Sequence, residues 1–307
     1  MLARIFRLSL FLCYLTAAAS AATPESVPPT NLKFSPVGGS GNPLPRGISP
    51  GAGIVGSLCC QIGSDAYSLN TLGFVLTKPY PNLVMTPPNG QGTGYAAGIN
   101  SNLNVVGQYC FSAACHGFFM ILDYADGYFP FSPIDFPGAL TTTANGINTS
   151  GTIVGSYCVH TSYCDLVVFD HGFMDSTGTF TTIDFPGAST TAINGINDAG
   201  DMVGAYSAGG PFHGWLRRGG VFTTIDLPGA KYSAAEGINK AGVVVGTYID
   251  AANHTHGFKH AGGVYTTIDH PQASITTADG IDDQGEIVGT YSPANSPVVL
   301  YIGYIAR

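Results

Sequence analysis

Apolar and polar residues alternate along most of the chain in short runs, and turn-forming residues interrupt these runs at regular intervals. Between Ala192 and Pro228, four such runs follow one another. Residues 197–200 (Asn-Asp-Ala-Gly) suit a tight hairpin, and Gly219-Gly220 suits a second one. A period of two with β-branched and aromatic residues predicts antiparallel strands. Since no long stretch has helical periodicity, we expect an all-β chain.

The four-strand pattern recurs, and short motifs mark each recurrence. A unit opens on Gly-Ile-Asn or a variant, continues through Val-Gly and His-Gly-aromatic, and closes on Ile-Asp-x-Pro. The units begin near residues 47, 98, 146, 195, 237 and 280. Motifs in so constant an order are an internal repeat rather than coincidence. Four antiparallel strands in about 45 residues are typical of one β-propeller blade.

We therefore predict a six-bladed β-propeller over residues 31–307, closed by an N-terminal strand. The sixth unit ends after its third strand, which we expect over 298–305, and it lacks a fourth. Residues 31–39 resemble a degenerate fourth strand placed before the first unit. Pairing of that strand with the last unit would protect a sheet edge. An open β-solenoid is the alternative, and it would not need the N-terminal fragment.

Residues 1–21 are typical of a secretory signal, and residues 22–30 form a linker. Arg4 and Arg7 supply the positive start, residues 8–15 the apolar middle, and Ala19-Ser20-Ala21 the small residues before cleavage. The apolar run is too short to span a bilayer. We expect a protein secreted to the periplasm or the extracellular space, without membrane insertion.

The charge balance argues against nucleic acid as a partner. Only 10% of the residues are charged, and the formal net charge is −8. Beyond Arg217-Arg218 there is no cluster of the basic residues that phosphate backbones require.

Six cysteines remain after the signal, and an exported protein favours disulfides. They are Cys59, Cys60, Cys110, Cys115, Cys158 and Cys164. We pair Cys110 with Cys115 and Cys158 with Cys164, because each pair shares one connection between the second and third strands of a unit, which we call the b–c loop. A vicinal Cys59–Cys60 bond stays open. A metal site with His116 or His160 is the alternative, which an oxidising compartment disfavours.

The histidines of the His-Gly-aromatic motif recur at one position per unit, so they should lie in separate blades and not share an ion. They are His116, His171, His213 and His256. We expect each to bond within its own blade to the Asp of Ile-Asp-x-Pro, because a half-buried Asp needs hydrogen-bond partners. His254 and His256 offer only two metal ligands on one strand face. We therefore expect no metal and no cofactor.

This combination of motifs resembles the HAF family of extracellular repeats, which is named after its His-Ala-Phe motif. The resemblance covers residues 47 to about 291, with Gly in the middle position of the motif. It implies export and a propeller-like β fold. It implies no activity and supplies no catalytic residues.

The leading functional hypothesis is a monomeric, non-catalytic binding or scaffold module for an extracellular protein or glycan. The b–c loops are the variable ones, and loops on a rigid scaffold commonly carry binding function. Three aromatic residues of these loops, Tyr67, Phe111 and Tyr163, are the candidate contacts. A purely structural surface protein is a further reading.

The catalytic alternative is an extracellular polysaccharide hydrolase or lyase with carboxylates near the propeller axis. Such chemistry needs two converging carboxylates. The candidates lie near the first strands of the last two units: Glu236, Asp279, Asp282 and Asp283. Glu236 and Asp279 stand where other units carry Asn145 and Asn194. The chain has no phosphate-binding glycine loop, nucleophile elbow or HExxH motif.

Overall fold

The computed structural model describes residues 32–37, 43–49, 53–58, 72–76, 83–85, 93–111, 114–123, 129, 131–160, 169–295 and 301–307. Within these ranges every regular element is a β-strand, so the expected all-β class is confirmed. The predicted signal and linker lie outside the described residues and stay predictions.

The strands follow the repeat. The first unit holds β2 (Pro43–Ser49), β3 (Gly53–Leu58), β4 (Leu72–Leu76) and β5 (Leu83–Met85). The second holds β6 (Thr93–Ile99), β7 (Asn104–Phe111), β8 (Ala114–Ile121) and β9 (Phe131–Ile134). The third holds β10 (Thr141–Ile147), β11 (Ile153–Cys158), β12 (His171–Ser176) and β13 (Thr179–Thr182). The fourth holds β14 (Thr190–Ile196), β15 (Met202–Ser207), β16 (His213–Arg218) and β17 (Val221–Ile225).

The last two units complete the set. The fifth holds β18 (Tyr232–Ile238), β19 (Val244–Ile249), β20 (Thr255–Ala261) and β21 (Val264–Ile268). The sixth holds β22 (Ala273–Thr276), β23 (Gly280–Ile281), β24 (Ile287–Pro293) and β25 (Ile302–Ala306), and β1 (Phe34–Pro36) pairs antiparallel with β25.

Within the fourth unit the chain is an antiparallel meander in the order β14–β15–β16–β17. The predicted hairpin at residues 197–200 closes with the Gly200 N–H donating to the Asn197 carbonyl at 3.0 Å. The Asn197 side-chain oxygen also accepts from the N–H groups of Ala199 and Asp201. Gly200 has φ = 80°, the left-handed conformation that favours glycine. Local turn chemistry therefore fixes this hairpin.

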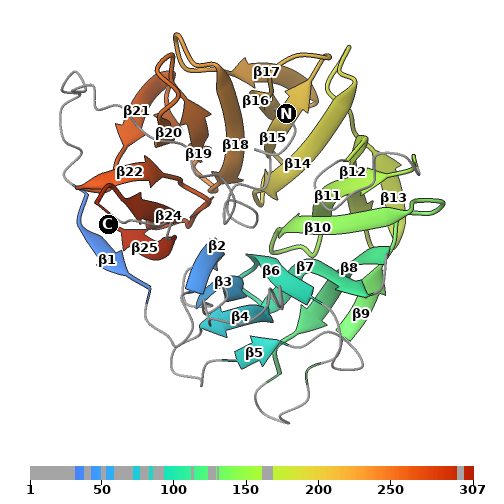
Figure 1. The fold of residues 1–307 in the computed structure, drawn as a ribbon. Helices are drawn as coiled ribbons and strands as arrows, with labels where there is room; N and C mark the ends of the chain where they lie inside the picture. The colour runs from blue at the N-terminus through green and yellow to red at the C-terminus, as the bar shows by residue number, and fades with distance from the viewer. Residues whose placement is uncertain are drawn as a thin grey trace.

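The sheets are arranged around a common centre (Figure 1). The strands β2, β6, β10, β14 and β18 lie toward the middle of the view, and successive ones contact each other. The short β23 contacts both β18 and β2. No sheet among the described residues closes on itself. Strands of neighbouring units pair with each other only at single parallel positions, such as Thr141 with Cys115, which extend one sheet into the next unit. The fold is propeller-like.

The glycine of the Gly-Ile motif lets the central strands approach each other. A Cβ on Gly280 would stand 2.7 Å from the Arg46 carbonyl oxygen, and one on Gly237 would stand 3.1 Å from Gly280 Cα. A side chain at Gly280 would clash with this backbone, and one at Gly237 would require its neighbours to shift. The motif is thus a requirement of packing at the centre.

The hydrophobic core lies between successive units. The aromatic residue of His-Gly-aromatic packs on the Val of Val-Gly in the preceding unit: Trp215 shares a cluster with Val154, and Phe258 shares one with Val203. Both aromatic side chains are fully buried. Each cluster combines residues of one unit with one or more residues of the unit before it, so neighbouring units complete each other's core.

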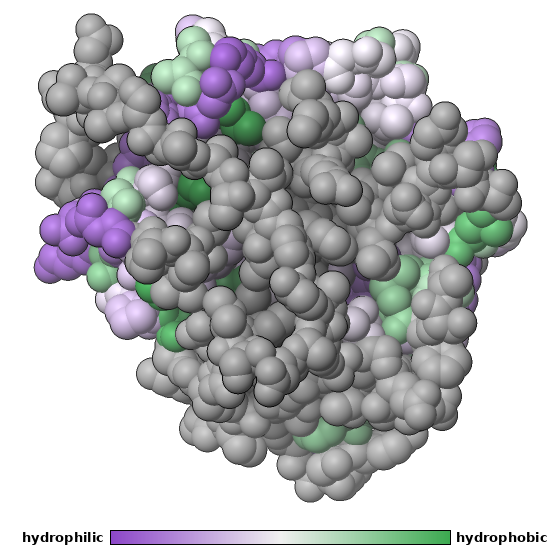
Figure 2. All heavy atoms as spheres, in the orientation of Figure 1, coloured by the Kyte–Doolittle hydropathy of each residue, from purple (hydrophilic) through white to green (hydrophobic). Residues whose placement is uncertain are grey.

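The described surface mixes polar and apolar residues. On the face seen in Figure 2, hydrophilic residues gather toward the rim and apolar ones show as small separate groups. Across the part of the chain that the structure describes, we find no helix with the length and apolar character needed to cross a bilayer.

Candidate functional site

A β-bulge interrupts the first strand of each unit, directly before the glycine of the Gly-Ile motif. In β10 the register shifts between Ala144 and Gly146, so Asn145 has no partner in the ladder with β11. The sixth unit shows the same two-to-one arrangement, because Asp279 N–H donates to the carbonyl of Val288 while Gly280 pairs with that residue. A bulge re-aims the side chain of the extra residue.

In each unit, the residue directly before this glycine therefore has no pairing partner of its own on the neighbouring strand. The residues at this bulged position are Arg46, Ala97, Asn145, Asn194, Glu236 and Asp279. They lie beside the glycines whose backbones meet at the centre. The structure thus brings Glu236 and Asp279 to adjacent equivalent positions, as their shared place in the repeat predicts.

The two asparagines of this set act as ties between units. Asn145 Nδ2 donates to the carbonyl of Ile193 at 2.9 Å, and Asn194 Nδ2 donates to the carbonyl of Ala235 at 3.0 Å. A carboxyl side chain has no amide N–H with which to make this tie. Glu236 and Asp279 therefore depart from the structural role that their asparagine counterparts fill.

Burial strongly raises the pKa of both of these carboxyl groups. Desolvation raises the pKa of Glu236 to about 8, with a further increase from the charge of Asp279 and an opposing effect of Arg46. Desolvation likewise raises the pKa of Asp279 to about 6, against the lowering effects of Arg46 and of the Thr277 hydroxyl, which donates to its Oδ2 at 3.0 Å. Both side chains nevertheless keep partial exposure to solvent. Carboxyl groups with separated and elevated pKa values are typical of acid–base catalysis.

Arg46 completes this group, and the sequence analysis missed it. Its guanidinium lies 4.5 Å from the centre of the Tyr95 ring, a cation–π distance. It acts on both carboxyl groups from the first unit, more than 180 residues away in sequence from either. The signal was present in the repeat, because Arg46 directly precedes Gly47, as Glu236 precedes Gly237.

Asp282 and Asp283 have different surroundings, at the β23–β24 turn rather than at the bulge. Asp282 Oδ1 accepts from the N–H groups of Gln284 and Glu286 at 2.9 and 2.8 Å. Asp283 accepts from the Lys240 N–H at 2.9 Å and pairs with Lys240 Nζ at 3.6 Å. Both carboxylates are therefore engaged in holding turns together.

The motif histidines bond as expected. Nδ1 of His116, His171, His213 and His256 lies 2.7–2.8 Å from the Asp of the Ile-Asp-x-Pro motif in the same unit. The four pairs occupy separate units. The prediction that each motif histidine bonds to the Asp of its own unit is confirmed, and these histidines do not converge on one ion.

The structure contains the predicted disulfide between Cys110 and Cys115. Cys158 is also disulfide-bonded. Its predicted partner Cys164 lies outside the described residues, as do Cys59 and Cys60, so those pairings stay predictions.

The side chains of the three aromatic residues proposed as binding contacts lie outside what the structure describes. Tyr67 and Tyr163 lie outside the described residues. Phe111 ends β7, but its side chain is outside what the structure describes. Their role in binding stays a prediction.

Comparison with known proteins identifies the fold and no family. None of the family models matches the sequence, and a search of curated proteins also finds no match. The resemblance to the HAF family is therefore not confirmed.

Solved structures do match, at low sequence identity. A triple arginine variant of AofleA from Arthrobotrys oligospora is 11% identical, with a TM-score of 0.52 over 91% of this chain and 87% of that one. A putative gluconolactonase is 10% identical, with a TM-score of 0.49 over 91% and 93% of the two chains. Virginiamycin B lyase from Staphylococcus aureus is 10% identical, with a TM-score of 0.47 over 90% and 100%. The likeness shows a shared all-β, propeller-like fold.

The expectation of a non-catalytic binding or scaffold module is contradicted. The solved structures that resemble the chain include enzymes by name, a lyase and a putative gluconolactonase, and this is the finding against that expectation. At 10% identity the likeness itself shows only the fold. The sequence alone could not show that Glu236 and Asp279 are both desolvated, or that Arg46 lies close enough to act on both.

Proposed function

We propose that this protein cleaves an extracellular polysaccharide, as a hydrolase or a lyase, with Glu236 and Asp279 as its catalytic carboxyl groups. The observation that carries the proposal is their placement at adjacent bulged positions with pKa values of about 8 and about 6. Environments that separate two carboxyl pKa values assign one group as acid and the other as base.

The chemistry follows from these protonation states. Near neutral pH Glu236 is mainly protonated, so its carboxyl proton is available to the oxygen of the departing sugar. Asp279 is mainly ionised, so it serves as the base that activates water or as the nucleophile. Arg46 opposes protonation of both groups and supplies the positive charge beside them. The pH–rate profile is therefore bell-shaped, with limbs near pH 6 and pH 8.

The presence of Arg46 bears on whether the reaction is an elimination or a hydrolysis. A lyase abstracts a proton beside a uronate carboxylate, and a guanidinium is well suited to pair with that carboxylate. A hydrolase needs the acid and base alone. The difference between the pKa values of Glu236 and Asp279 supports hydrolysis more directly. The product distinguishes the two reactions, because hydrolysis gives only a new reducing end and elimination gives an unsaturated sugar.

We also propose that the repeat units are six blades of one closed propeller, secreted after loss of residues 1–21. Support for closure comes from β1, whose residues Phe34, Ser35 and Pro36 pair with Ala306, Ile305 and Tyr304. It also comes from the contacts of β23 with β2, which link the sixth unit to the first. Closure is what would place the bulged positions of units one, five and six around one axis.

The test is a panel of neutral and acidic polysaccharides incubated with the purified chain. We expect reducing ends or unsaturated products from at least one of them. Glu236→Gln and Asp279→Asn should each lower kcat at least about 100-fold, the usual scale of general acid–base catalysis. Asp283→Asn is the matched control, since Asp283 lies at a turn, and it should retain activity. Loss of activity in the control alone, or equal activity in all variants, would refute the assignment.

A further inference from the structure

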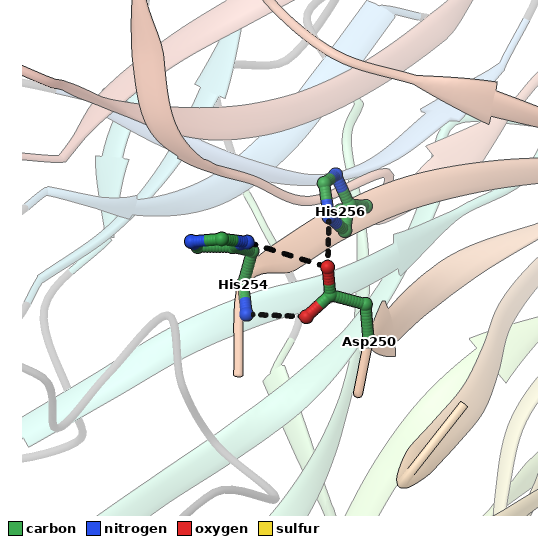
Figure 3. Close-up of side chains that lie close together, drawn as sticks. All are labelled: Asp250, His254 and His256. Atoms are coloured by element: carbon green, nitrogen blue, oxygen red, sulfur yellow. Dashed lines mark hydrogen bonds and ion pairs between the residues drawn. The ribbon is translucent and has the colours of Figure 1, made fainter. Parts of the chain in front are cut away.

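A second group of side chains gathers at the tip of the β19–β20 hairpin. Asp250, His254 and His256 each direct one potential ligand atom toward the others, and these atoms all lie within 4.8 Å of one another. Figure 3 shows both imidazole rings turned toward the Asp250 carboxylate. The Oδ2 atom of Asp250 lies 3.3 Å from His254 Nδ1 and 3.6 Å from His256 Nε2.

The hairpin holds this arrangement through its own backbone. The Asp250 N–H donates to the His254 carbonyl at 3.0 Å, and the Asn253 N–H donates to the Asp250 carbonyl at 3.1 Å. Asp250 Oδ1 accepts from the His254 N–H at 2.8 Å, which leaves Oδ2 directed at the two rings. The carboxylate is therefore oriented before any ligand arrives.

Asp269 orients the His256 ring through the ring nitrogen that does not face Asp250. Nδ1 of His256 lies 2.8 Å from Asp269 Oδ1, the pairing common to all four motif histidines. When Nδ1 carries the proton donated to Asp269, Nε2 has a free lone pair facing Asp250. A histidine that binds a metal characteristically donates its other ring N–H to a carboxylate in this way. The structural His–Asp pair of the repeat is thus already arranged as the support of a metal ligand.

We propose that Asp250, His254 and His256 bind a divalent transition metal, with Zn²⁺ as the representative ion. Zn²⁺ at roughly 2.1 Å from each of four tetrahedral ligands holds neighbouring ligand atoms about 3.4 Å apart. The separations of 3.3 and 3.6 Å from Asp250 Oδ2 match that spacing. The two ring nitrogens lie within 4.8 Å of each other, and a rotation of the His254 ring, whose side chain is 44% exposed, would bring them closer.

Two nitrogens and one carboxylate oxygen leave at least one coordination position open. Zinc sites with three protein ligands and an open fourth position are typical of ions that bind water or a substrate group. The imidazole and carboxylate set suits Zn²⁺ and its first-row neighbours better than Ca²⁺ or Mg²⁺, which prefer oxygen ligands alone. The site would therefore take a transition ion that can accept one further ligand from solution.

The sequence could not reveal this site because only two of its ligands form a recognisable pair. His254 and His256 point to the same strand face, and two ligands are insufficient. The third, Asp250, comes from the other strand through the turn. Among the described residues, this is the one place where three such groups converge.

Metal uptake is tested on the full chain without an affinity tag, after treatment with a chelator and dialysis. Titration calorimetry with Zn²⁺ should show one equivalent bound, and Co²⁺ should give the intense visible absorption of a tetrahedral site. His254→Ala and Asp250→Asn should each weaken binding at least about 10-fold, and Asp269→Asn about 10-fold to 100-fold. Zn²⁺ should also raise the melting temperature of the original protein and not that of His254→Ala.

The fourth unit provides matched controls. His213→Ala and Asp226→Asn remove the equivalent His–Asp pair, 2.7 Å apart, where no third ligand was found. Both variants should bind Zn²⁺ as the original protein does. Failure of the protein to take up Zn²⁺, or unchanged uptake in His254→Ala, would overturn the proposal. None of the three ligands belongs to the carboxylate site, so metal binding and polysaccharide cleavage can succeed or fail independently.

Discussion

Gly204 of β15 lies directly against the indole of Trp215 on β16. A Cβ on Gly204 would stand 2.9 Å from Trp215 Cζ2 and 1.9 Å from the carbonyl oxygen of Ala192. Gly246 has the same relation to Phe258, at 2.8 Å. The glycine of Val-Gly therefore provides the space that the aromatic residue of His-Gly-aromatic fills. This packing explains why the two motifs recur together.

Gly204→Ala should destabilise the protein by about 3 kcal/mol, the upper part of the range for overpacking, since backbone as well as the indole must move. Denaturant unfolding measures the change. Gly210→Ala is the control, because a Cβ there would meet nothing within 4 Å, and its free energy of unfolding should stay nearly constant. Equal stability of the two variants would contradict this packing argument.

Removal of residues 31–39 should cause aggregation or a large fall in melting temperature, because it exposes the edge of β25. The N–H of Lys33 donates to the Arg307 carbonyl at 3.0 Å, and the Val37 N–H donates to the Gly303 carbonyl at 3.0 Å. Unpaired edges of this kind promote association. Light scattering and calorimetry would follow the effect, with deletion of residues 22–30 alone as the control. A truncated chain that stays monomeric and equally stable would argue against the closed ring.

Replacing Cys110 and Cys115 together by serine should lower the free energy of unfolding by about 2 kcal/mol, the entropic value for so short a loop. Chemical denaturation under non-reducing conditions measures the loss. Peptide mapping of the original protein should in addition link Cys158 to Cys164. A free thiol at Cys164 would show that Cys158 has a different partner.

Stability should depend on pH through Glu236. Its pKa is about 8 in the folded chain and 4.5 ordinarily, so the folded state retains a proton that the unfolded state releases. The contribution of Glu236 is therefore complete below about pH 4.5 and is lost as pH rises to about 8. In Glu236→Gln this decline of stability with pH should become shallower. The difference should be clearest between pH 6 and 8, because the contribution of Asp279 is lost by about pH 6 and Glu236 then accounts for the remaining decline. Parallel stability curves for the two proteins would refute the elevated pKa.

The repeat motifs predicted the strand pattern because each motif has a local cause. The hairpin at 197–200 follows from its asparagine and glycine, and the His213–Asp226 pair follows from the placement of both residues in one unit. Such features depend on neighbours within about 20 residues. They are legible in a single sequence, and the structure reproduces them.

The candidate sites were harder to predict because they depend on contacts between distant residues. Arg46 influences Glu236 although the two are separated by most of the chain. The effect of burial on Glu236 has no local signature either, since the same position holds Asn145 in another unit. Asp250 joins His254 and His256 only because the hairpin turns back at Asn253, which has φ = 70°.

The bulge before each central glycine has a consequence for protein engineering. Because the bulged residue takes no part in strand pairing, the strand ladder does not fix its identity, and side chains as different as Arg46, Ala97 and Glu236 occupy it in one molecule. A combinatorial library at this position in units one, two, five and six would vary the chemistry at the centre, while Asn145 and Asn194 keep their hydrogen bonds between units. In each of these units, a single amino-acid substitution would therefore change the side chain presented near the centre of the molecule.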